Sequence, residues 1–260
     1  MNTLVFDIET VPDVELGRAL YSLEDLPDED VARVMRFRQK QTRGTDFLPL
    51  PQHRIVAISV VLRSADDLHV FSIGEETSDE AELVRRFYDG LEKYVPELVS
   101  WNGSGFDLPV LHYRALRHSI VAEKYWDIGN DDREFRFNNY LGRFHWRHID
   151  LMDVIAAYQA GGRSTLEQVA LLLGFPGKLG MSGALVWDRF CEGRIADIRN
   201  YCETDVLNTY LVYLRFQLMR GILDAQRHAD ELERLREKLA GESAAHLQEF
   251  LAAWNRGKNP

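Results

Sequence analysis

The N-terminal segment carries two carboxylates whose spacing suits a metal site. Asp7 and Glu9 interrupt the otherwise almost continuously apolar run Thr3–Thr10, which stops at Pro12 as a buried central strand does. Residues two apart on a strand leave the same face, about 6.6 Å apart along the backbone, so both carboxylates can share a cation cluster. Acids near strand ends also often simply face water. The pair alone therefore leaves a metal site and a solvated strand end as equal alternatives.

A third carboxylate, Asp107, follows the short apolar segment Leu98–Trp101 and the glycine-containing loop Asn102–Gly105. Ligands bind at the carboxyl ends of strands in open α/β sheets, which favours a functional position. An Asp two residues before a proline, here Pro109, is also a good helix N-cap, and taken alone the cap is the favoured interpretation. The loop lacks the spacing and the lysine of a P-loop, so we do not interpret it as a phosphate cradle.

A fourth acid, Asp205, falls inside an apolar stripe that recurs at spacings of three or four. The stripe consists of Ile198, Cys202, Thr209, Val212 and Phe216. This position puts a charge on the buried face of a helix, where a carboxylate is costly unless it is paired or binds a cation. Tyr201 lies four residues earlier, one helical turn away, so its hydroxyl can project toward the same spot. A salt bridge to an arginine and a metal site both fit this pattern.

In chain order, these residues resemble the three exonuclease motifs of the DEDD (DnaQ-like) superfamily, written DxE, N-x3-F-D and Y-x3-D. The matching segments are Asp7–Glu9, Asn102–Asp107 and Tyr201–Asp205. The second motif and the tyrosine form of the third look most like the proofreading exonuclease domain of family B DNA polymerases. Arg147–Asp153 and Gly177–Gly180 also look like segments of bacterial stand-alone proteins of that type. The resemblance extends from Thr3 to about Arg220.

The resemblance implies a metal-dependent 3′-to-5′ exonuclease that acts on the 3′ ends of single-stranded DNA or RNA and releases nucleoside 5′-monophosphates. It also implies that Tyr201 helps to position a water and that four acids hold two divalent cations. These acids are Asp7, Glu9, Asp107 and Asp205. Oxygen ligands favour magnesium or manganese over zinc. Because an unperturbed phenol titrates near ~10, orienting the water suits Tyr201 better than acting as a strong base.

Three further residues are candidate substrate contacts. Asn102 and Phe106 belong to the second motif, and Phe106 can stack on a terminal base without reading its sequence, although core packing is the default for it and for Trp101. Lys178 stands between glycines and is a candidate phosphate contact.

Other polar residues in the matching stretches are expected in structural roles. We expect capping or surface roles for Asp150 and Asp153, and packing or substrate contact for His145 and His148. No cysteine or further histidine stands at zinc spacing from these two histidines.

The hydrophobic pattern predicts the order βββαβα, followed by further helices. We expect an α/β fold with a ribonuclease H-like mixed sheet flanked by helices. Capping boxes at Thr77/Glu80 and Ser164/Glu167 predict two helix starts. The expected strands are Thr3–Thr10, Ile55–Leu62, Leu68–Ile73 and Leu98–Trp101, and the expected helices are 77–94, 107–116, Thr165–Leu173 and Ile195–Met219.

Two segments look like additions to this exonuclease domain, which we place at residues 1–220. Residues 13–53 form an insert much longer than the usual ~4 to 6 residues between strands. We expect there a helix with one acidic and one basic end, pinned by Val31, Val34 and Met35, and we favour this over a phosphate-gripping arm. The segment 221–260 is expected to be a helical C-terminal extension that breaks at Gly241 and covers the domain.

The composition limits the partners of the protein. The 260 residues include 31 Lys and Arg against 41 Asp and Glu, a net charge of −10, so the whole molecule repels a polyanion and any nucleic-acid contact must be local. The longest nearly apolar run, Ile55–Leu62, is far shorter than the roughly 20 residues of a membrane span. The N-terminus does not resemble a secretory signal, so a cytoplasmic location is expected. The two cysteines match neither a disulfide framework nor a zinc site, and we expect them to be buried as small apolar groups.

Two alternative functions stay open at this stage. One is a phosphodiesterase for dinucleotides or other small phosphate esters, which keeps the chemistry and changes the substrate. The other is a module that binds nucleic-acid ends or a protein without cutting, although intact acids at all four positions argue against it. The sequence does not separate DNA from RNA, because the contact that does so is to the sugar 2′-hydroxyl.

Overall fold

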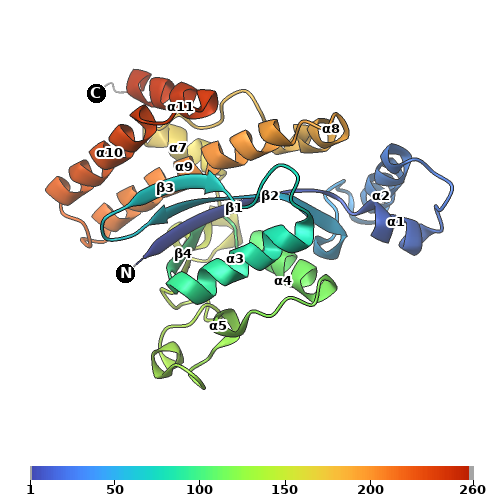
Figure 1. Cartoon of the computed structure of the whole chain (residues 1–260), viewed down its shortest axis with the longest axis horizontal. Helices are drawn as coiled ribbons and strands as arrows, with labels where there is room; N and C mark the ends of the chain where they lie inside the picture. The colour runs from blue at the N-terminus through green and yellow to red at the C-terminus, as the bar shows by residue number, and fades with distance from the viewer. Residues whose placement is uncertain (1, 258–260) are drawn as a thin grey trace.

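A computed structural model describes residues 2–257 of the chain. Its centre is a five-stranded sheet of order β3-β2-β1-β4-β5, in which β1, β2 and β3 pair antiparallel while β4 and β5 run parallel to β1 (Figure 1). This is the predicted ribonuclease H-like mixed sheet flanked by helices, and the expectation is confirmed. The strands are β1 Thr3–Pro12, β2 His53–Arg63, β3 Leu68–Ser72, β4 Glu97–Ser100 and β5 His148–Asp150.

Alternate residues of β1 enter different halves of the core. Phe6 and Ile8 pack with α3 (Glu80–Tyr94) and α4 (Asp107–Arg117) on one face of the sheet. Val5 packs on the other face with the long helix α9 (Ile195–Met219), which has the predicted bounds. Because strand side chains alternate between faces, Asp7 and Glu9 share the face of Val5 and point toward α9. Figure 1 shows α9 and α3 on opposite sides of the sheet.

The insert between β1 and β2 has structure of its own. Its helix α2 (Asp28–Arg43) has three acids in the first turn and Lys40 and Arg43 in the last turn, as expected. Val31 and Met35 of this helix are buried, so the prediction of a packed helix is confirmed. A second helix, α1 (Val14–Tyr21), was not predicted. It lies so close to α2 that a side chain at Gly17 would collide with Met35.

The predicted capping box at Thr77 and Glu80 is wrong. Asp79 caps α3 instead, and its carboxylate accepts from the Glu82 backbone N–H at 2.8 Å. The carboxylate of Glu80 is buried and pairs with Arg114 of α4. A long-range partner therefore outweighs the local capping role that the spacing suggested.

The helix α7 (Leu166–Leu172) does begin with a capping box, but one residue later than predicted. Thr165 and Gln168 form it in place of Ser164 and Glu167. The two pairs have the same spacing and equivalent chemistry, so the local sequence alone does not distinguish them.

The segment after α9 covers the α9 side of the sheet, as expected. Helices α10 (Ala225–Ala240) and α11 (Ala245–Arg256) bury Leu235, Leu239 and Phe250 in the same cluster as α9, with a break at Gly241. The division at residue 220 stays a prediction, and residues 258–260 of the predicted extension lie outside the described residues. No helix within residues 2–257 is long and apolar enough to cross a membrane.

The remaining helices are short. They are η1 Leu50–Gln52, α5 Glu123–Trp126, η2 Arg133–Arg136, α6 Leu151–Ile155, η3 Ala160–Gly162, η4 Gly183–Leu185 and α8 Val186–Cys191.

Candidate active site

Three elements bring the four predicted acids together. Asp7 and Glu9 lie on the α9 face of β1, Asp205 lies in the middle of α9, and Asp107 is the first residue of α4, after the strand that neighbours β1. The Asp107 Oδ1 atom accepts a hydrogen bond from the Ile8 backbone N–H at 3.2 Å. Asp107 is not the N-cap of α4, because Phe106 occupies that position. We call Asp7, Glu9, Asp107 and Asp205 the acid cluster.

Each carboxyl of the acid cluster is harder to ionise than usual. Burial is the first cause in every case. The charges of the other acids add to it, raising the pKa of Asp7 and Glu9 well above the usual range. The pKa of Asp107 rises to about 7, although hydrogen bonds from backbone amides partly offset the rise. Like charges that approach one another in a poorly solvated site favour a positive partner.

The acid cluster fits hard divalent cations. Asp205 Oδ1 is buried and has no hydrogen-bond partner among the described residues, which leaves a carboxylate oxygen free to bind an ion. Carboxylate oxygens are the ligands that magnesium and manganese prefer. Within residues 2–257, no lysine or arginine forms an ion pair with any of the four acids. The grouped negative charges therefore favour a bound divalent cation.

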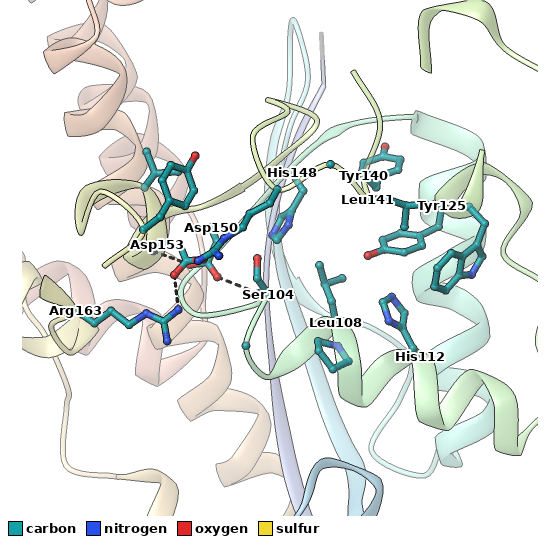
Figure 2. Close-up of a pocket in the computed structure, with 17 residues that line it drawn as sticks. Ser104, Leu108, His112, Tyr125, Tyr140, Leu141, His148, Asp150, Asp153 and Arg163 are labelled. Carbon is teal, nitrogen blue, oxygen red and sulfur yellow. Dashed lines mark hydrogen bonds and ion pairs between the residues drawn. The ribbon is translucent and has the colours of Figure 1, made fainter. Parts of the chain in front are cut away.

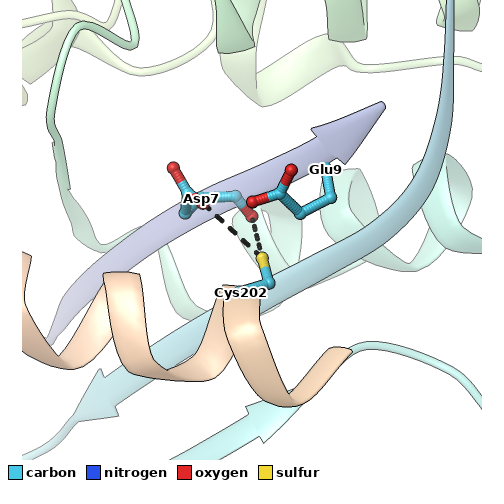
Figure 3. Close-up of side chains that lie close together, drawn as sticks. All are labelled: Asp7, Glu9 and Cys202. Atoms are coloured by element: carbon cyan, nitrogen blue, oxygen red, sulfur yellow. Dashed lines mark hydrogen bonds between the residues drawn. The ribbon is translucent and has the colours of Figure 1, made fainter. Parts of the chain in front are cut away.

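Cys202 contacts the acid cluster, which the sequence did not predict. Its Sγ lies 3.4 Å from the Asp7 carbonyl oxygen and 3.6 Å from Asp7 Oδ2 (Figure 3). One ligand atom each from Asp7, Glu9 and Cys202 lie within 4.8 Å of one another. Burial and the charges of Asp7 and Glu9 raise the pKa of the Cys202 thiol, so it acts as a weak hydrogen-bond donor. The expected burial of Cys202 is confirmed, whereas Cys191 is exposed.

Tyr201 and Lys178 lie beside the acids. Burial and the neighbouring carboxylates raise the pKa of Tyr201, so its hydroxyl keeps its proton and lowers the pKa of Asp205. The ammonium of Lys178 lies 5.6 Å from the centre of the Tyr201 ring, and its charge lowers the pKa of Glu9 and Asp205. The structure thus brings both predicted residues to the acid cluster.

The loop before Asp107 is held in a fixed shape. Asn102 has a positive φ of 66°, and its carbonyl oxygen accepts from the backbone N–H groups of Gly105 and Phe106. The carboxylate of Asp150 accepts from the N–H groups of Asn102 and Ser104, both at 3.0 Å. Asp150 also caps α6, as expected, but its hydrogen bonds to this loop were not predicted. These hydrogen bonds join residues 48 and 46 apart in the chain, so no local pattern indicates them.

Phe106 forms an aromatic group with two residues that the sequence analysis missed. Its ring centre lies 5.5 Å from that of Phe47 and 5.0 Å from that of His53. These three residues and Glu9 line a cavity of about 410 Å³, to which Arg36 of α2 also contributes. The insert therefore supplies part of the wall beside Glu9. Phe47 lies in the irregular stretch before η1, next to Leu48, and has no helical or strand period that would indicate its partners.

The other histidines and Trp101 have structural contacts. The buried His148 hydrogen-bonds Ser100 at 2.9 Å, and burial lowers its pKa to about 4. His145 Nδ1 accepts from the Asn139 backbone N–H. Trp101 is half-buried against the cluster around α9. These contacts agree with the packing roles expected for His145, His148 and Trp101.

Comparisons with known proteins give a family and two partial relatives. Residues 45–254 match the family described as "Predicted 3'-5' exonuclease related to the exonuclease domain of PolB". The match includes Asp107, Tyr201 and Asp205, whereas Asp7 and Glu9 precede it. DNA polymerase 1 of Sulfurisphaera ohwakuensis is 39% identical over 80 residues, which are 30% of this chain and 8% of that protein.

One solved structure, the family B DNA polymerase from the archaeon Pyrobaculum calidifontis, has 18% sequence identity and a TM-score of 0.48. The similarity covers 97% of this chain and 27% of that one. The chain thus spans a small part of the polymerases that it matches.

Proposed function

Because the chain belongs to the family of predicted 3′-to-5′ exonucleases related to the exonuclease domain of PolB, we propose that it shortens single-stranded nucleic acid from the 3′ end. The bond broken is that between phosphorus and the 3′ oxygen of the penultimate nucleotide. A water oxygen forms the new bond to phosphorus, and the 3′ oxygen leaves with the electron pair. The product is a nucleoside 5′-monophosphate.

The observation that carries this proposal is the acid cluster itself. Four carboxylates from β1, α4 and α9 converge with raised pKa values, and one buried oxygen, Asp205 Oδ1, has no hydrogen-bond partner within residues 2–257. We assign Asp7, Glu9, Asp107 and Asp205 as ligands of two divalent cations, magnesium or manganese. Bound cations of this kind supply Lewis acidity to the attacking water and to the leaving oxygen of an in-line displacement.

Tyr201 orients the attacking water in this proposal. Its raised pKa means that the hydroxyl is a donor and acceptor of hydrogen bonds but not a base at neutral pH. It lies beside Asp205, so it can hold a water at the edge of the acid cluster. Lys178, whose ammonium lies 5.6 Å from the centre of the Tyr201 ring, provides a positive charge for the scissile phosphate.

The cavity beside Glu9 is the proposed place of the 3′-terminal nucleotide. Phe106 and the half-exposed Phe47 offer ring faces on which an unpaired base can stack. Asn102 is the proposed contact to the strand from the loop before Asp107. A base that stacks here cannot remain paired in a duplex, which supports a preference for single-stranded ends.

The same site suits a phosphodiesterase for dinucleotides as a second candidate. The net charge of −10 favours this reading, because a short substrate has fewer phosphates to repel. Both candidates require the same acids, so substrate length separates them.

The test is incubation of the protein with 5′-labelled single-stranded DNA, RNA and dinucleotides in magnesium or manganese. We expect a stepwise ladder of shortened labelled strands, loss of cutting with a chelator, and a block by a 3′-phosphate. Hydrolysis of dinucleotides alone would select the second candidate. Release of the 5′ label as the first product would reverse the polarity, and no cleavage of any substrate would overturn the proposal in favour of a binding module.

A further inference from the structure

A second cavity lies on the other side of the loop that leads to Asp107. It measures about 480 Å³, within the ~300 to 1,000 Å³ range of small-molecule sites. Ser104 and Gly105 form part of its wall, whereas the next residue, Phe106, lines the cavity beside Glu9. One loop therefore separates the two cavities. We call the second one the aromatic cavity (Figure 2).

One end of the aromatic cavity consists of rings. His112 of α4 lies 4.9 Å from both Tyr125 and Trp126 of α5, measured between ring centres. Trp126 is 52% exposed, so its indole keeps contact area that the protein does not use. Figure 2 shows His112 and Tyr125 together at this end. A half-exposed indole beside an imidazole is a surface on which a nucleobase can stack.

His112 brings a polar atom with no partner to the same end. Its Nε2 is buried and makes no hydrogen bond with any described residue. Burial lowers the pKa of His112 to about 4, so the ring is neutral at physiological pH and can donate or accept. A buried polar group without a partner costs free energy. A ligand with a hydrogen-bonding edge would remove this cost.

The opposite end of the aromatic cavity carries two guanidinium groups. Arg143 and Arg163 both bind the carboxylate of Asp153, at 3.0 and 2.5 Å. The two guanidiniums share this single carboxylate, whereas Asp150, which also lines the cavity, directs its two oxygens to the N–H groups of Asn102 and Ser104. Arg143 and Arg163 are partly exposed and keep N–H groups for an anion. Phosphate is the anion that such a pair of guanidiniums recognises best.

We propose that the aromatic cavity binds one nucleotide unit, with its base against Trp126 and His112 and its phosphate at Arg143 and Arg163. The unit has two possible sources: a nucleotide of the substrate strand upstream of the cleaved bond, or a free nucleoside 5′-monophosphate. The strand source rests on the proposed function, since the strand must then have its 3′ end beside Glu9. Binding of a nucleotide in the aromatic cavity does not rest on it.

The test measures binding without cleavage. In an Asp205→Asn background with magnesium, the affinity for a fluorescein-labelled single-stranded 12-mer is compared between Trp126→Ala and a control, Trp146→Ala. Trp146 is 42% exposed but lies away from the aromatic cavity, against Arg220. We expect Trp126→Ala to weaken binding by about tenfold, as the loss of one base-stacking contact does. The control should stay within twofold.

Two further variants test the aromatic cavity independently in case Trp126→Ala does not fold. His112→Phe keeps the ring contacts and deletes Nε2, and should weaken binding severalfold. Arg163→Gln should reduce the slope of log affinity against log salt by about 0.7, the value for one phosphate contact with a single strand. If His112→Phe, Arg163→Gln and Trp126→Ala all bind as their background does, the proposal is overturned.

The two sources give different patterns. For the strand source, the Trp126→Ala change in the otherwise unaltered protein raises KM for the 12-mer about tenfold, leaves kcat unchanged and leaves dinucleotide hydrolysis unchanged. For the free nucleotide, deoxyadenosine monophosphate binds the Asp205→Asn protein and Trp126→Ala abolishes this binding. Trp126-dependent binding without any hydrolysis by the unaltered protein would refute the proposed function and keep this inference. Normal hydrolysis together with binding that none of the three variants changes would refute this inference and keep the proposed function.

Discussion

Two groups of buried acids, each with a member in or just after β1, have opposite surroundings. Asp13, the residue after β1, has its Oδ2 2.6 Å from Nη1 of Arg114, whose other nitrogens bind Glu80 at 2.7 and 2.5 Å. His118 adds a further contact to Glu80 at 2.9 Å. Glu9 of the acid cluster lies only four residues before Asp13, yet within residues 2–257 no lysine or arginine forms an ion pair with any acid of that cluster. We call Asp13, Glu80, Arg114 and His118 the ion-pair cluster.

The two clusters differ in whether the chain supplies a cation for each buried carboxylate. In the ion-pair cluster, Arg114 is itself buried and donates to both carboxylates, so their charges face a cation of the same chain. In the acid cluster, the carboxylates repel one another, and a bound divalent cation would reduce this repulsion. Acids that destabilise the fold and are nevertheless grouped together are typical of a functional site.

Asp205→Asn should separate activity from stability most sharply. It removes a proposed metal ligand and one of the repelling charges, so hydrolysis should fall by at least about 10³-fold while the melting temperature of the metal-free protein stays equal or rises. Single-turnover cleavage and thermal unfolding of one preparation check both. Asp66→Asn, in the exposed turn between β2 and β3, is the matched control. Activity near that of the control would remove Asp205 from the site.

Arg114→Met should produce the opposite pattern. It leaves Asp13 and Glu80 buried without their cation, so the free energy of unfolding should drop by about 3 to 5 kcal/mol. Urea denaturation measures this. Arg86→Met, which removes an exposed pair with Glu82 one helical turn away, should cost under ~0.5 kcal/mol. Equal losses in the two variants would show that the ion-pair cluster does not stabilise the fold.

Tyr201→Phe should lower turnover without affecting the fold. The ring and its packing remain, so the melting temperature should hold while the rate falls by about 10²-fold through the loss of a positioned water. If the hydroxyl only satisfies a hydrogen bond, stability drops by ~1 kcal/mol and turnover per folded molecule holds. Tyr113→Phe, on the exposed side of α4, controls for the substitution. A Tyr201→Phe rate within threefold of the unaltered protein would count against the catalytic role.

The smallest expected effect is in the response to pH. Contacts with the Leu16 backbone N–H and with Arg114 lower the pKa of Asp13 against the effect of its burial. Its contribution, on the order of 1 kcal/mol, is therefore present above the unfolded pKa near ~3.9 and is lost as the pH falls through the lower folded value. Melting temperatures measured from pH 2 to 6 should fall more steeply with acid in the unaltered protein than in Asp13→Asn.

In samples treated with a chelator, the contribution of the acid cluster to stability should change with pH in the opposite direction to that of Asp13. Its raised pKa values mean that the folded state binds protons more tightly than the unfolded chain, so its contribution to stability declines as the pH rises from about 4 toward 7. Added divalent cation should abolish this decline. An acid cluster that stabilised the chelated fold as the pH rose would contradict the description of its surroundings.

The sequence predicted the acid cluster better than the ion-pair cluster, and the reason is physical. Asp7, Glu9 and Asp205 interrupt regular apolar periods of a strand and a helix, where a charge is conspicuous. Asp107 and the role of Tyr201 came from the resemblance to the exonuclease motifs. Arg114 stands 101 residues from Asp13 and 34 from Glu80, and no period links them.

Local ambiguity explains most of the remaining errors. Glu80 fitted a capping box with Thr77, yet the folded chain uses it for a long-range ion pair. The box of α7 was displaced by one residue because Ser164 and Thr165 have the same capping chemistry. Phe47 joined the wall beside Glu9 through the path of the insert, which its composition does not encode. Strands β1 to β4 and α9 had nearly the predicted bounds, whereas β5, with only three residues, was not predicted.

The contact between Cys202 and Asp7 has a consequence for folding kinetics. It joins residues 195 apart in the chain, so the acid cluster exists only when the first strand and α9 have met. Contacts between distant residues carry a large entropic cost of loop closure and form slowly. During refolding, helical circular dichroism should therefore recover before cleavage does. The chain would then pass through a stage at which its secondary structure is present but the acid cluster is not assembled, so that nucleic acid is not cleaved.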